Sequence, residues 1–115
     1  MSARLQSGFF VAAHLRLCAS QGVVAVLRRR GAEEAGAIFV KVDRLDGTAD
    51  LYGPAPQSLV DEEDDGRRRF QLISAPGTDS ATIEERFARE VKFDSDVWLI
   101  EIEDREGRSF LDLVG

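Results

Sequence analysis

Two arginine triplets are the first residues of this 115-residue chain whose types and spacing could do chemistry. Their guanidinium groups could grip phosphates if the two segments lay side by side. No exposed aromatic residue is expected beside either triplet for base stacking, and a net charge of −6 would repel a polyanion. We therefore expect cross-strand pairing with Glu101, Glu103 or an acidic loop, and keep weak nucleic-acid binding as an alternative. The triplets are Arg28, Arg29 and Arg30, and Arg67, Arg68 and Arg69.

Carboxylates in the C-terminal part of the chain could carry acid–base chemistry, with or without a divalent ion. One of them would have to be desolvated, and several would have to converge on one cleft. Alternation along a strand places Glu101 and Glu103 on one face, which we expect to be solvated. Trp98 in the same segment is expected to anchor the core rather than to hold a ligand. The candidates for such a site are Asp94, Asp96, Glu101 and Glu103.

His14 and Cys18 lie four residues apart in a helical pattern, so they share a helix face. Imidazole and thiolate bind zinc, but a structural zinc site needs four ligands, and the chain has one histidine and one cysteine. A catalytic triad would have to use His14, and no serine stands in a Gly-x-Ser-x-Gly sequence. The acidic run Asp61–Asp65 lacks the spacing of a calcium-binding loop. We therefore expect no catalytic residue, metal ion or cofactor.

The composition is that of a folded domain with its own core. Hydrophobic residues make up 43% of the chain and charged residues 31%, which argues against disorder. The length predicts a single domain over 1–115. Cys18 is the one cysteine, which excludes an intrachain disulfide and favours the cytoplasm. No apolar run reaches the length of a membrane span or a secretory signal, so we expect no membrane contact.

Hydrophobic periodicity predicts the elements that position these residues. The pattern indicates one helix over 9–21 and a second helix that begins after Ser80 as its N-cap. The pair Asp46-Gly47 between two alternating segments predicts a hairpin with a type I′ turn. The segment 97–103 is apolar on both faces in its first half, which is typical of a central strand. Strands are expected over 23–27, 38–43, 48–52, 67–74 and 97–103.

The order of these elements predicts an α+β fold, α-β-β-β-β-α-β, with one further strand possible at the C-terminal end. Adjacent hairpins imply a largely antiparallel sheet of about five strands, with the two main helices on one face. The connection over 54–66 contains the acidic run and is long for a loop, so we expect it to be mobile or functional.

Several stretches of the sequence are specific enough to compare with known families. They are Val42–Leu51, Gly53–Gln57, Arg89–Glu90, Phe93–Trp98 and Glu101–Gly107. These stretches resemble the small bacterial proteins of the domain-of-unknown-function 1491 family, and the resemblance covers nearly the whole chain. It implies a stand-alone, cytoplasmic bacterial protein. It transfers no functional residue, because the family carries no assigned activity, cofactor or partner.

The leading hypothesis is a non-catalytic binding or protein-interaction module, because the chain combines few potential catalytic residues with many charges. The expected contact surfaces are an exposed sheet edge, the loop over 54–66 and the arginine triplets. The expected partner is another protein or a second copy of the chain, through edge pairing or helix packing. A carboxylate-based enzyme, with or without a divalent metal, is kept as an alternative. The binding candidates are the two triplets, the four carboxylates named above and Trp98.

Overall fold

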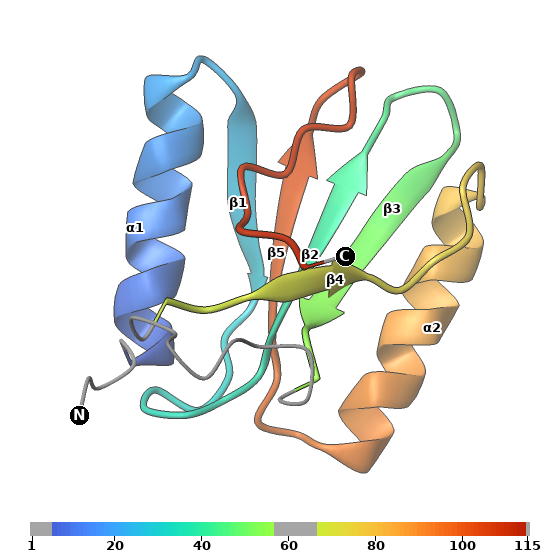
Figure 1. Ribbon diagram of the computed structural model, residues 1–115. Coiled ribbons are helices and arrows are strands. Elements are labelled where there is room, and N and C mark those ends of the chain that lie inside the picture. Colours follow the sequence, from blue (N-terminus) through green and yellow to red (C-terminus); the bar gives the residue numbers. More distant parts are fainter. Residues whose placement is uncertain (1–5, 57–66, 115) are drawn as a thin grey trace.

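The computed structural model describes residues 6–56 and 67–114. Five strands form one mixed sheet with a helix on each side of it (Figure 1). The strand order is β1-β5-β2-β3-β4. β5 pairs parallel with β2, and the other three pairings are antiparallel. This confirms the predicted α+β fold and its order of elements. The elements are α1 (Ser7–Ser20), β1 (Val24–Arg29), β2 (Ile38–Asp43), β3 (Ala49–Pro54), β4 (Phe70–Leu72), α2 (Ser80–Phe93) and β5 (Trp98–Glu103).

The two helices cover opposite faces of the sheet, so the prediction that both lie on one face is wrong. Ile38, Val40 and Val42 of β2 pack in one cluster with residues of α1. Phe39, whose side chain points the other way, packs in a second cluster with residues of α2. β2 is buried at five of its six positions, and a strand buried on both faces needs a cover on each.

β5 lies at the centre of the sheet, between β1 and β2, which confirms the position predicted from its apolar first half. Trp98, Ile100 and Ile102 face α1, and Leu99 faces α2. All of them are buried. The strand therefore joins the two hydrophobic clusters, and its polar residues, Glu101 and Glu103, lie in its second half.

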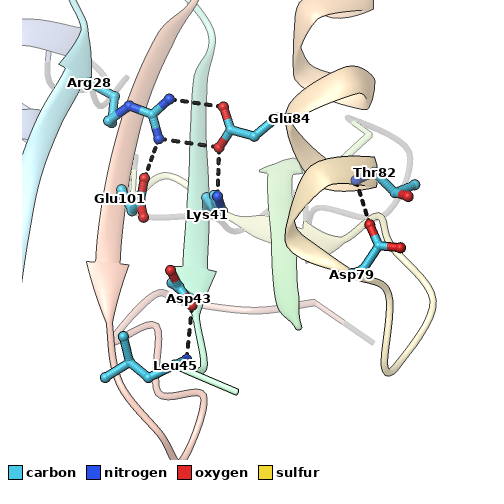
Figure 2. Close-up of polar contacts among 8 residues, drawn as sticks. All are labelled: Arg28, Lys41, Asp43, Leu45, Asp79, Thr82, Glu84 and Glu101. Carbon is cyan, nitrogen blue, oxygen red and sulfur yellow. Dashed lines mark hydrogen bonds and ion pairs between the residues drawn. The ribbon is translucent and has the colours of Figure 1, made fainter. Parts of the chain in front are cut away.

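A hairpin joins β2 to β3 as predicted, but its turn is wider than the expected two-residue type I′ turn. Positive φ angles fall at Leu45 (63°) and Gly47 (91°) rather than at two adjacent residues. Two aspartates hold this wider loop. Asp43 Oδ1 accepts the Leu45 N–H at 2.8 Å (Figure 2), and Asp46 Oδ1 accepts the Thr48 N–H at 2.9 Å. Aspartate side chains that bond the backbone two residues on stabilise turns of this kind.

The N-cap of α2 is Asp79, not Ser80 as predicted. Asp79 Oδ1 accepts the N–H of Thr82 at 2.7 Å (Figure 2), and Ser80 is the first residue of the helix. The hydrogen bonds from Thr82 lower the pKa of the Asp79 carboxyl. A carboxylate at this position also lies at the positive end of the helix dipole, which favours Asp79 over its serine neighbour.

The two edges of the sheet differ. β4 is shorter than the predicted strand over 67–74, and the C-terminal segment pairs with it: the Phe70 N–H donates to the Asp112 carbonyl and the Val114 N–H to the Phe70 carbonyl, each at 2.9 Å. β1 has β5 as its one neighbour, and no residue in 6–56 or 67–114 pairs with its outer edge. Most of the acidic connection predicted to be mobile, residues 57–66, lies outside the described part of the chain.

Candidate functional site

Arg28 occupies a β-bulge near the end of β1. The register of the β1–β5 pairing shifts between Leu27 and Arg29, so Arg28 is the extra residue. A bulge adds one residue to a strand and bends the strand locally. The guanidinium of Arg28 binds Glu101 on β5 and also Glu84 on α2, where the Nη2–Oε1 distance is 2.9 Å (Figure 2). Arg28 therefore binds Glu101, one of the partners expected for the arginine triplets.

Lys41 of β2 completes a network of four ionic groups. Its side chain is 5% exposed, and its Nζ donates to Glu84 Oε2 at 2.6 Å (Figure 2). Hydrogen bonds from Arg28 and then Lys41 lower the pKa of the Glu84 carboxyl to about 2. Glu84 and Glu101 in turn raise the pKa of Arg28. We call Arg28, Lys41, Glu84 and Glu101 the ionic network; it links α2 to three strands.

Beside the ionic network lies a part of the sheet that α2 leaves open. Ala25 and Leu27 of β1 pack against the α1 cluster, so Val24 and Val26 point to the other face. Val24 is 56% exposed and Val26 is 48% exposed. Glu103 of β5, the partner of Val24 in the ladder, is exposed as well. We call the outer edge of β1 together with Val24 and Val26 the β1 edge surface.

Arg28 of the first triplet and Arg68 of the second lie on opposite faces of the sheet. Arg68 Nη2 donates to Ser7 Oγ at 3.0 Å, and its guanidinium lies 5.9 Å from the centroid of the Phe10 ring, on the α1 side of the sheet. Arg67 lies 3.8 Å from a carboxylate oxygen of Asp112. Arg28 is held in the ionic network on the α2 side. A phosphate group therefore cannot bridge Arg28 and Arg68.

Trp98 is buried beneath the end of the first triplet. Its side chain is 1% exposed, and its Nε1–H donates to the Ala32 carbonyl oxygen at 2.8 Å. The Arg30 guanidinium lies 5.4 Å from its ring centroid, and Arg29 Nη2 donates to the Ser95 carbonyl at 3.1 Å. Trp98 thus packs in the core with its one donor satisfied, a geometry that leaves no face of the indole for a ligand.

The four candidate carboxylates do not converge on one cleft. Asp94 and Asp96 lie in the turn before β5, where Asp94 Oδ1 accepts the Asp96 N–H at 2.9 Å. Glu103 lies at the opposite end of β5, a strand about 16 Å long. Glu101 belongs to the ionic network. In the part of the chain that the structure describes, no three His, Cys, Asp or Glu side chains gather where they could hold a metal ion.

His14 and Cys18 share the buried face of α1 as the spacing predicts. His14 Nε2 lies 2.9 Å from the Ser109 carbonyl oxygen, and the ring stacks on Phe10 at 5.6 Å. Burial lowers the pKa of His14 and raises the pKa of the Cys18 thiol. A neutral imidazole and a protonated thiol are the states that suit a core, and they do not suit nucleophilic chemistry.

An open hollow of about 440 Å³ lies beside the β2–β3 hairpin. The buried Asp50 carboxylate accepts two hydrogen bonds on Oδ2 from Arg44, from Nε at 3.0 Å and Nη2 at 2.8 Å. This ion pair raises the pKa of Arg44. Tyr52 and Leu72 also line the hollow. The charges of Arg44 and Asp50 neutralise each other, so this pair gives the hollow no net charge with which to select an ion.

Sequence reasoning missed two members of the ionic network, Lys41 and Glu84, and the exposure of Val24 and Val26. Lys41 had a signal: it is a cation between apolar residues of a strand, and a buried lysine requires a carboxylate. Glu84 had no such signal in the sequence, because its position in α2 suits any exposed residue. The valines alternate like core residues, and only the topology shows that β1 is an edge.

The fold and the site together define a small α+β protein with a two-sided sheet and a closed ionic network beside an open strand. The chain belongs to the family described as "Protein of unknown function (DUF1491)", whose model matches residues 5–112. No helix among the described residues is long and apolar enough to cross a membrane.

Solved structures of similar proteins share this architecture. The solution structure of protein Atu0922 from A. tumefaciens is 45% identical over 96% of this chain and 94% of that chain, with a TM-score of 0.81. The crystal structure of a DUF1491 family protein from Caulobacter crescentus CB15 is 33% identical, covers 95% and 96% of the two chains and has a TM-score of 0.76. No curated protein shows significant similarity to the chain.

Proposed function

We propose that this protein is a non-catalytic interaction module that receives an extended polypeptide strand at the β1 edge surface. One observation carries the proposal: Val24 and Val26 are about half exposed on a strand that the described residues pair on one side only. A partner strand added there would gain main-chain hydrogen bonds from β1, and its alternate side chains would cover the two valines.

The sequence of β1 favours a binding role over an exposed edge that has no function. Natural edge strands are protected by charges, prolines, bulges or covering segments, because a bare edge promotes unwanted pairing. In β1 the bulge and the arginines come only at the end, at Arg28 and Arg29, and the four residues before them are apolar. The other edge of the sheet, at β4, is paired with the C-terminal segment. The contrast supports an edge kept open for a partner.

The two alternatives have less support from the positions of their residues. The carboxylate enzyme needs four carboxylates in one cleft. Asp94 and Asp96 lie in the turn before β5, whereas Glu103 lies at the far end of that strand. The nucleic-acid binder needs the arginine triplets on one surface, and Arg28 lies on the opposite face of the sheet from Arg68. A cytoplasmic location, which the single cysteine favours, belongs to the same proposal.

Photo-crosslinking in the cell tests the proposal. With a photoreactive amino acid in place of Val26, we expect a covalent adduct whose cross-linked peptide maps to the partner strand. The matched control is Leu72, which is exposed to a similar degree, 44%, but lies on β4. Adding Val24→Lys should abolish the Val26 adduct, because an ammonium group cannot be covered at that position. An adduct that survives Val24→Lys, or no adduct at all, would contradict the proposal.

A further inference from the structure

We infer that the strand received by β1 carries a lysine or arginine beside Val24 and an apolar residue beside Val26. This inference rests on the proposed function and names the chemistry of the partner. It follows from two rows of side chains that cross the sheet on the face toward α2, one starting at Val24 and the other at Val26. The first row contains unpaired negative charge, and the charges of the second row are already neutralised.

The first row crosses four strands and contains two acidic residues. It consists of Val24, Glu103, Asp43 and Ala49, which pair in that order. Glu103 is exposed, and Asp43 is partly exposed. Asp43 Oδ1 accepts the Leu45 N–H (Figure 2), and neither carboxylate makes an ion pair with a described residue. Because like charges on neighbouring strands repel each other, this row favours an added cation.

The second row has its charges matched within the chain. Val26 pairs with Glu101, and Glu101 pairs with Lys41. Both charged residues belong to the ionic network, in which two cations and two carboxylates bind one another. A charged side chain beside Val26 would find no partner and would lose hydration as it covered the valine. An apolar side chain suits this position, because it packs against a valine that is 48% exposed.

A basic side chain beside Val24 can reach Glu103 across a single strand. Neighbouring strands lie about 4.8 Å apart, so a strand added to β1 would lie about 10 Å from β5. Lysine and arginine pack their aliphatic stems against apolar surface and keep the charged group in water. The stem would cover Val24, and the charged group would lie at the Glu103 carboxylate. One residue of the partner thus meets both the exposed valine and the unpaired carboxylate.

The other end of β1 disfavours a basic residue, so the two ends of the strand are not equivalent. Arg29 donates to the Ser95 carbonyl at 3.1 Å and to the Arg30 carbonyl at 3.4 Å. It makes no ion pair with a described carboxylate, so its charge repels a second cation at this end. The net charge of −6 attracts a basic partner to the chain, and the local charges direct its basic residue to the Val24 end.

The sequence of the cross-linked strand gives the first test. With the photoreactive amino acid in place of Val26, we expect the partner residue joined to it to be apolar. A lysine or arginine should lie two residues away from the joined residue, because alternate residues of a strand share one face. Mass spectrometry of the cross-linked peptide reads both positions. A captured strand with no basic residue two positions away on either side overturns the inference.

Charge reversal at Glu103 tests the contact itself, with a synthetic peptide of the captured segment as the probe. Glu103→Gln should raise the Kd of the peptide about threefold and Glu103→Lys about tenfold, measured by fluorescence anisotropy. Glu85→Lys, at an exposed position on α2, is the matched control and should leave the Kd unchanged. A peptide with glutamate in place of its basic residue should bind Glu103→Lys more tightly than wild type. An unchanged Kd in Glu103→Lys, or no such recovery, overturns the inference.

Thermal unfolding shows that the loss of binding is not a loss of fold. Glu103→Gln removes one of two neighbouring like charges, so its Tm should equal or exceed that of wild type. A lower Tm would contradict the repulsion between Glu103 and Asp43 from which the inference starts.

The inference and the proposed function can fail separately. An adduct at position 26 that is lost in Val24→Lys but keeps its full yield in Glu103→Lys refutes the basic partner residue and leaves the interaction module standing. The absence of any adduct at position 26 refutes both.

Discussion

Replacement of Trp98 by alanine should lower the free energy of unfolding by about 3–5 kcal/mol, the cost of deleting a large buried aromatic side chain. Trp98 is 1% exposed and is among the largest buried side chains of the described core. Its removal would leave a cavity under β5, and it would leave the Ala32 carbonyl without the indole donor. Urea unfolding followed by circular dichroism measures the loss.

A milder variant keeps this prediction testable where Trp98→Ala does not fold. Trp98→Phe retains an aromatic ring beneath Arg30 and loses the Nε1–H, so we expect a cost of about 1–3 kcal/mol from the unpaired carbonyl and the smaller ring. Unfolding free energies within about 0.5 kcal/mol of wild type for both variants would contradict the core role of Trp98.

Replacement of Glu84 by glutamine should lower the free energy of unfolding by about 2–3 kcal/mol. It leaves the buried Lys41 ammonium without the carboxylate that it binds at 2.6 Å. Breaking a fully buried pair costs about 3–5 kcal/mol. The cost here is smaller because the Glu84 side chain is 39% exposed. The matched control is Glu85→Gln, an exposed neighbour on α2, which should change stability by less than about 0.5 kcal/mol.

A double-mutant cycle separates the pair from its surroundings. Lys41→Met should cost little, because Glu84 keeps Arg28 as a partner. In the Lys41→Met background, Glu84→Gln should cost less than it does in the wild type, because no buried ammonium is left unpaired. Equal costs in the two backgrounds would show that Glu84 and Lys41 do not interact.

Glu84→Gln should also change how the stability of the protein depends on pH. The ordinary pKa of a glutamate is 4.5, and the pKa of Glu84 in the folded protein is about 2. Between these values the unfolded chain binds a proton that the folded protein does not, so stability falls as the pH falls through this range. Because Glu84 is partly exposed, its contribution to this loss of stability is about 1–2 kcal/mol. Glu84→Gln should reduce the acid-induced loss by that amount relative to wild type.

Local patterns in the sequence predicted most of the fold, because each element carries its own periodicity. The helical spacing of His14 and Cys18, the apolar first half of β5 and the pair Asp46-Gly47 each specify a local structure. The parallel pairing of β2 with β5 could not be predicted in this way. It joins strands that are far apart in sequence, and the consequence is that α1 and α2 lie on opposite faces.

The candidate site was less accessible to sequence reasoning. Glu101 was one of three partners expected for the arginine triplets, because opposite charges on neighbouring strands attract. Glu84 comes from a helix whose face toward β1 depends on the whole topology. The open edge of β1 is a property of strand order, and Val24 and Val26 look like ordinary core residues until the order is known. Asp94 and Asp96 lie close to β5 in sequence, but the extended strand keeps them away from Glu103.

Amide hydrogen exchange along β1 tests the central claim most directly, because it reports on the strand's own backbone. The central claim is that the outer edge of β1 receives an extended strand of a partner polypeptide. Alternate amides of residues 24–27 point outward, and they should exchange rapidly in the purified protein and more slowly once the partner captured through Val26 is added, whereas the amides of β4 should not respond. Exchange of the outward amides that the partner leaves unchanged would contradict it.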